Sequence, residues 1–124
     1  MIDEKILQTE LAIVGSLILD SDNNPDMMDA SQFQFAELRQ LFNLAVKTRG
    51  AADPTWAMLQ QIDELGLDTA IYERATDAGA VRMNFEGNVK AHERLMKVRR
   101  INDLGRHLVE ATPADLEAVI QKVE

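Results

Sequence analysis

The chain contains no cysteine, few aromatic residues and no apolar run long enough to span a membrane. Without cysteine there is no disulfide framework and no thiolate zinc site, which suits a reducing cytoplasm. Aromatic residues make up 5% of the chain and hydrophobic residues 46%, so a core must consist mainly of aliphatic side chains. The longest apolar run, LAIVGSLIL, falls far short of the roughly 20 residues that a membrane helix needs. We therefore expect a cytoplasmic domain that does not contact membranes.

The motifs that carry catalysis or bind cofactors are also missing. No G-x-x-x-x-G-K-[ST] pattern occurs and the glycines are isolated, so we expect no phosphate-binding loop. His92 and His107 belong to no H-E-x-x-H pattern, and each is interpreted as a surface or interface side chain rather than a ligand. Neighbouring carboxylates such as Asp63 and Glu64 lack the apolar setting that separates two carboxyl pKa values for acid–base work. No catalytic, cofactor-binding or metal-binding residue is predicted, and a small enzyme is the least favoured function.

The net charge of −8 disfavours nucleic acid as a direct partner, because an acidic chain repels the phosphate backbone. The basic residues are nevertheless unevenly spread, and one C-terminal stretch carries Lys90, Arg94, Lys97, Arg99, Arg100 and Arg106. Such a cluster is usually a solvated helix face or half of an ion-paired contact. Both interpretations stay open from the sequence, and the cluster is also the one place where a phosphate could dock.

Helix signals cover most of the chain, and no segment shows the sustained alternation of a strand. Each proline follows a residue that caps helices well, in the pairs Asn24-Pro25, Asp53-Pro54 and Thr112-Pro113. Caps and apolar spacing together predict about seven helices, over residues 3–20, 25–30, 35–49, 53–65, 68–78, 84–111 and from 113 onward. The chain is thus predicted to be all-α.

Two of these helices are predicted to build much of the core. Residues 11–19 are apolar nearly all round, so the first helix should be the most buried, with Gln8 and Glu10 off its apolar face. Gly15 costs about 1 kcal/mol of helix propensity relative to alanine, and close approach of another helix would explain it. The inward face of the third helix is predicted to carry Leu38, Leu41, Phe42, Ala45 and Val46.

The helix predicted over residues 84–111 is the element around which the rest is organised. Asn84 is its expected N-cap, and at about 1.5 Å per residue it spans roughly 40 Å, more than a compact domain of this size needs. Its apolar side chains recur mostly at intervals of three and four: Phe85, Val89, Leu95, Met96, Val98, Ile101, Leu104 and Leu108. We expect this stripe, with the helix after it, to form an oligomer interface. An ordinary long core helix is the open alternative.

Several stretches share the pattern of one known family. ELAIVGSLILD at residues 10–20, RQLF at residues 39–42 and VKAHERLMKVRRINDLGRHL at residues 89–108 resemble three helices of the N-terminal domain of DnaB-type replicative DNA helicases. The similarity covers about residues 7–108, and Gly50, Asp53 and Thr55 fit the family's intervening loop. Leu38 stands where the family usually has histidine, and residues 67–84 lack its usual residues. Such divergence would fit a phage or prophage member.

The resemblance implies a non-catalytic collar with a multi-helix head over residues 1–84 and a helical hairpin over residues 85–124. The hairpin would be cut short before a linker and an ATPase motor, and ATP and magnesium would belong only to that absent motor. Hairpins of neighbouring subunits would pair, and primase or a helicase loader would dock. The implied contact residues are Leu95, Val98, Ile101, Leu104, Leu108, Leu116 and Ile120. A free-standing helicase-loading or inhibitory regulator with the same fold is the alternative.

Overall fold

A computed structural model describes residues 2–110 of the chain, with side chains described for residues 2–105. Regular structure in this range is entirely helical: α1 (Ile2–Leu19), η1 (Pro25–Met27), η2 (Ala30–Gln32), α2 (Ala36–Thr48), α3 (Pro54–Glu64), α4 (Thr69–Val81) and α5 (Phe85–Glu110). The all-α prediction is therefore confirmed for the described residues. The expected second arm of the hairpin, beginning at Pro113, lies outside them.

The helices begin where the predicted capping residues stand. The side-chain oxygen of each cap accepts a backbone N–H: Asn24 from Asp26 at 3.0 Å, Asp53 from Trp56 at 3.1 Å and Asn84 from Gly87 at 3.0 Å. After α3 the chain turns at Gly66, whose φ of +69° is a left-handed conformation that glycine adopts without a Cβ penalty. The single short helix expected over residues 25–30 is instead two 3-10 turns, η1 and η2.

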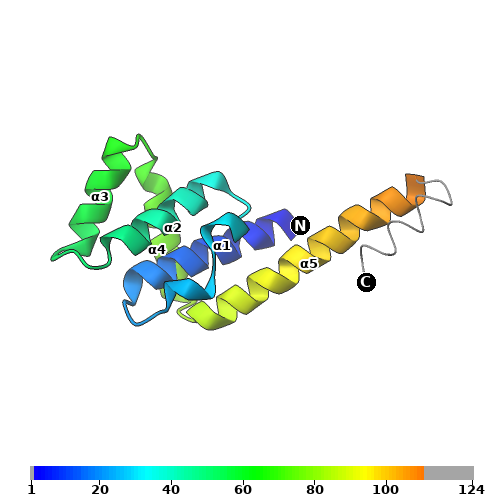
Figure 1. Cartoon of the computed structure of the whole chain (residues 1–124), viewed down its shortest axis with the longest axis horizontal. Helices are drawn as coiled ribbons and strands as arrows, with labels where there is room; N and C mark the ends of the chain where they lie inside the picture. Colours follow the sequence, from blue (N-terminus) through cyan, green and yellow to red (C-terminus); the bar gives the residue numbers. More distant parts are fainter. Residues whose placement is uncertain (1, 111–124) are drawn as a thin grey trace.

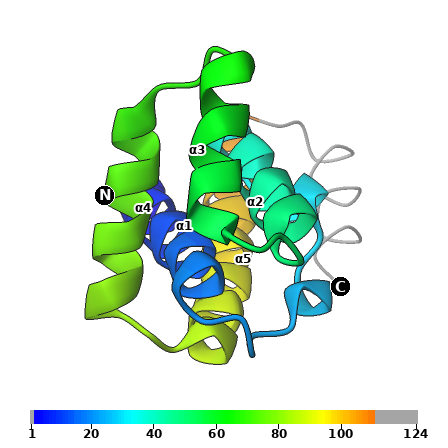
Figure 2. The same cartoon turned by 90° about the vertical axis from the view of Figure 1, so that its left-hand side faces the viewer.

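Helix α1 lies at the centre of the head, with α4 and α5 packed along it and α2 alongside (Figures 1 and 2). Every residue from Leu11 to Leu17 is buried, which confirms that the first helix is the most deeply buried element. This burial is possible because these residues are apolar or small on all sides of the helix, so each neighbouring helix meets a surface free of charge.

Two glycines bring the backbones of α1 and α4 into direct contact. A Cβ added to Gly15 would lie 1.8 Å from the carbonyl oxygen of Ala75, and one added to Gly79 would lie 2.4 Å from the carbonyl carbon of Gly15. The close approach predicted at Gly15 is confirmed. Gly79, which follows the helix predicted over residues 68–78, lies inside α4 because that helix continues to Val81.

Some apolar side chains face solvent contrary to expectation. Val46, predicted to face inward on α2, is exposed because the buried face of that helix is centred on Leu41, Ala45 and their neighbours. Helix α3 packs mainly on α2 and α4, so only Met58 and Ile62 are buried from it. Trp56, the only tryptophan, is consequently 63% exposed.

Helix α5 belongs to the head at one end and leaves it at the other. Phe85 and Val89 are buried members of the hydrophobic core. The C-terminal part of the helix extends past the start of α1 (Figure 1). The predicted division between head and hairpin at residue 84 stays a prediction, although the first turns of α5 complete the core of the head. Among residues 2–110, every helix is too short or too polar to traverse a lipid bilayer.

Candidate functional site

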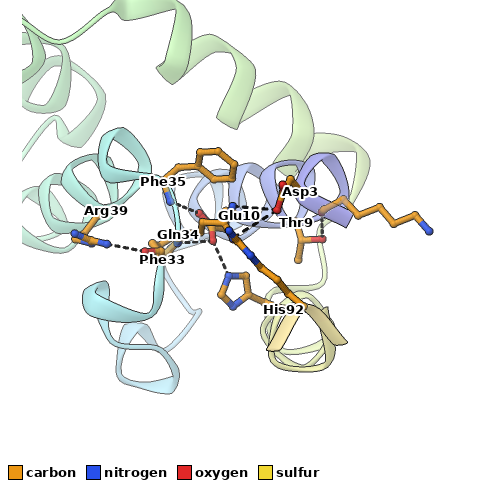
Figure 3. Close-up of polar contacts among 10 residues, drawn as sticks. Asp3, Thr9, Glu10, Phe33, Gln34, Phe35, Arg39 and His92 are labelled. Carbon is orange, nitrogen blue, oxygen red and sulfur yellow. Dashed lines mark hydrogen bonds and ion pairs between the residues drawn. The ribbon is translucent and has the colours of Figure 1, made fainter. Parts of the chain in front are cut away.

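A buried carboxylate and imidazole tie α5 to the centre of the head. Glu10 on α1 is fully buried, and its Oε2 lies 2.7 Å from Nε2 of His92 on α5. The same carboxylate accepts the backbone N–H groups of Gln34 at 2.8 Å and Phe35 at 3.2 Å. Figure 3 shows the Glu10 carboxylate between these two backbone groups and the imidazole ring. The Glu10 side chain thus links α1 to two other parts of the head: the segment that precedes α2, and helix α5.

The interpretation of His92 as a surface or interface side chain is therefore wrong, and so is the placement of Glu10 off the buried face. His92 is only 2% exposed and also lies 6.2 Å from the ring of Phe33, between centroids. A buried carboxylate must be paired, because leaving it without hydrogen bonds or an opposite charge costs several kcal/mol. Neither group is accessible to a substrate, so the pair positions α5 rather than performing chemistry.

Arg99 forms a second attachment between α5 and the head, about two turns beyond His92 on the same helix face. Its guanidinium donates to the Gln34 side chain and lies 3.5 Å from the carboxylate of Asp3. Since Arg99 and Asp3 are both partly exposed, this ion pair contributes at most about 1 kcal/mol. The contact shows that α5 still lies along α1 at residue 99.

Beyond Arg99 helix α5 continues to Glu110, and we call residues 100–110 the arm; the side chains of residues 100–103 are exposed. Ile101 on the arm is 59% exposed, and Val98, one turn earlier, is 46% exposed. An interval of three residues advances about 300° around a helix, so a stripe spaced by threes turns about 60° per step. The stripe starting at Leu95 therefore winds away from the His92 face, and Ile101 lies on the opposite side.

The structure places four of the seven predicted contact residues with their side chains. Leu95 and Leu104 are partly exposed, whereas Val98 and Ile101 are exposed. Leu108 lies on α5, but its side chain is outside the described set, and Leu116 and Ile120 lie outside the described residues altogether. That these residues contact a second subunit stays a prediction.

A groove of about 980 Å³ lies between α1, α4 and α5. Its apolar lining consists of Leu11, Ala78, Val81, Ala91, Leu95 and Val98. Its charged lining consists of Lys5, Arg74, Arg82 and Arg94, together with Glu4 and Asp77. The sequence did not predict this groove, because its three sides come from segments that are far apart along the chain.

Within residues 2–110, no three histidine, aspartate or glutamate side chains come close enough together to hold a metal ion. Comparisons of the chain with protein-family models, with curated proteins and with solved structures find no match. The function of this chain is therefore inferred from the arm, from the head that holds it and from the sequence resemblance.

Proposed function

We propose that this chain is the non-catalytic N-terminal collar domain of a DnaB-type replicative helicase, which assembles subunits and docks primase or a loader. The observation that carries the proposal is the exposed apolar stripe where α5 leaves the head. Val98 and Ile101 are 46% and 59% exposed, and no described residue covers them. Large apolar side chains grouped on a protruding helix are typical of a protein interface.

The attachment of α5 supports the same function. Glu10 and His92 anchor the helix inside the head, and Arg99 holds it at the edge, so the arm leaves in a defined direction. An arm with a fixed direction loses little conformational entropy when it binds another subunit. Paired hairpins of two subunits, each predicted over residues 85–124, could bury a standard-size interface of roughly 1,600 Å² in total.

Charged substitutions on the arm are expected to weaken the assembly of subunits. Ile101→Asp combined with Leu104→Asp places two carboxylates on the stripe, so the molar mass measured by light scattering should fall toward that of a monomer. Because Ile101 is exposed and Leu104 only partly buried, the circular dichroism spectrum should stay helical. The matched control is Asn102→Asp, which adds a carboxylate to an exposed position about 100° around the helix from Ile101, on the side away from Leu104, and should leave the mass unchanged.

Two results would count against an assembly role for the arm. One is a double variant that unfolds, because the stripe would then be part of a core. The other is an unmodified chain that remains monomeric across the concentration series.

The charge predicts the behaviour of the chain on heparin. With a net charge of −8, the chain should elute at physiological salt without retention, because a polyanion is repelled by most of the surface. Arg100→Glu should elute at the same position, since there is no retention to lose. Strong retention of the unmodified chain would contradict a collar that does not itself bind nucleic acid.

A further inference from the structure

We propose that the groove between α1, α4 and α5 is a docking site for an acidic amphipathic helix of a partner protein. The shape and charge of the groove carry this proposal, and of the predicted subunit contacts the groove shares only Leu95 and Val98. The occupant is defined by its chemistry: apolar side chains at intervals of three and four on one face, flanked by glutamate or aspartate.

The basic side chains that line the groove form no ion pair with any residue that the structure describes. Lys5, Arg74, Arg82 and Arg94 outnumber the two carboxylates that share the lining. Among residues 2–105, none of these four basic side chains forms an ion pair. In a chain whose net charge is −8, a concentration of unpaired cations around one groove is a local exception. A ligand with carboxylates on its flanks would complement it.

The apolar lining of the groove favours a ligand that also presents apolar side chains. Val81 at one edge is 85% exposed and Val98 at the other is 46% exposed, above a floor that includes the buried Leu11. A helix about 10–12 Å across and rising 1.5 Å per residue occupies roughly 120–170 Å³ per residue, so a 980 Å³ groove receives about two turns. Two turns present about three apolar side chains, the usual anchors of a helix bound in a groove.

A polypeptide fits this lining better than a nucleic acid does. Single-stranded nucleic acid is held by aromatic side chains on which bases stack, and none of the lining residues is aromatic. A concave site between three helices likewise does not match a flat anionic membrane.

Segments of the same chain suit the groove less well. The exposed part of α5 from a second copy would bring Lys97, Arg100 and their basic neighbours against the basic edge of the groove. The acidic segment 113–124 follows α5, which ends about 18 Å beyond Val98. If this segment filled the groove, an added peptide would bind only after the apolar side chains of the segment had been replaced. A separate partner is therefore the favoured occupant.

The test uses the full chain and a fluorescein-labelled peptide of about 16 residues, long enough to form a helix. The peptide carries leucine at helical intervals of three and four, with glutamate on both flanks. Fluorescence anisotropy should show saturable binding in the range of about 10–100 µM, weakened by salt, as expected for a short groove with charged edges. A peptide with glutamine in place of every glutamate should bind at least about tenfold more weakly.

Variants locate the binding. Arg74→Glu combined with Arg82→Glu should weaken peptide binding by at least about tenfold. Val81→Asp should weaken it to the same extent, because it places a charge on the apolar edge of the groove. The matched control, Arg100→Glu, reverses a charge on exposed α5 away from the groove and should leave binding within about twofold. All these side chains are exposed, so the helical circular dichroism spectrum should not change.

The proposal would be overturned by no binding of the acidic peptide at about 1 mM, by equal binding of the glutamine peptide, by insensitivity to the groove variants, or by tighter binding of a single-stranded oligonucleotide or anionic vesicles. Peptide binding that appears only after Leu116→Asp and Ile120→Asp would assign the groove to the chain's own C-terminal segment and also overturn it. The groove variants should not change the molar mass of the chain. Conversely, Ile101→Asp combined with Leu104→Asp should not weaken binding of the peptide. Failure of the groove and failure of the collar can thus be told apart.

Discussion

Replacing Glu10 with alanine should lower the free energy of unfolding by about 3–5 kcal/mol, measured by urea denaturation followed by circular dichroism. The change removes the hydrogen-bond partner of the buried ring nitrogen of His92 and of two part-buried backbone N–H groups, those of Gln34 and Phe35. Each unpaired donor costs about 1–3 kcal/mol, and the lost side chain adds a cavity. Because a domain of this size is stable by only about 5–15 kcal/mol, the loss should be obvious.

Glu93→Ala is the matched control for this prediction. Glu93 is a neighbour of His92 on α5 but is exposed, so its removal should change the free energy of unfolding by no more than about 0.5 kcal/mol. Gln at position 10 should give an intermediate loss, since one amide oxygen cannot accept from every donor that the carboxylate satisfies. A Glu10→Ala variant within about 1 kcal/mol of the unmodified chain would show that the pair does not hold α5 to the head.

His92→Ala tests the same attachment from the other helix. In a double-mutant cycle, the combined loss for Glu10→Ala and His92→Ala should be clearly smaller than the sum of the single losses, because both remove one contact. Additive losses would mean that the two side chains act separately. With the pair broken, α5 loses its buried polar attachment to α1, so the direction of the arm should become less defined.

Gly15→Ala should destabilise the chain by about 3 kcal/mol, although alanine in a helix is normally worth about 1 kcal/mol more than glycine. The new methyl group would lie 1.8 Å from the Ala75 carbonyl oxygen, a backbone atom that cannot move without separating α1 from α4. The thermal midpoint measured by circular dichroism should fall by more than about 10 °C. Gly79→Ala should act similarly, since its Cβ would meet the backbone of Gly15 at 2.4 Å.

Gly105→Ala is the control of opposite sign. Within the part of the chain that the structure describes, no atom beyond the neighbouring helix backbone lies within 4 Å of a Cβ built on Gly105, so the substitution should stabilise α5 by about 0.5–1 kcal/mol through helix propensity alone. If Gly15→Ala also stabilised the chain, α1 and α4 would not be in backbone contact. This contact also matters for the groove, because it places Arg74, Val81 and the rest of that face of α4 beside α1.

Local sequence patterns determined the helical elements of this protein. Asn24, Asp53 and Asn84 each begin a helix or 3-10 turn because their side chains accept backbone N–H groups a few residues away. Apolar residues at helical spacing identified α1 as the most buried helix, and Gly15 indicated a close approach along it. These features depend on neighbours within one or two turns, so a single sequence is enough to find them.

The tertiary structure alone decided which segments meet. Glu10 and His92 are separated by 82 positions, and no spacing rule connects a carboxylate on one helix with an imidazole on another. The exposure of Val46 and Trp56 likewise depends on how many helices cover α2 and α3, not on their own apolar patterns. The groove exists only because α1, α4 and α5 converge. Periodicity shows which face of a helix is apolar, but only the packed fold determines what covers that face.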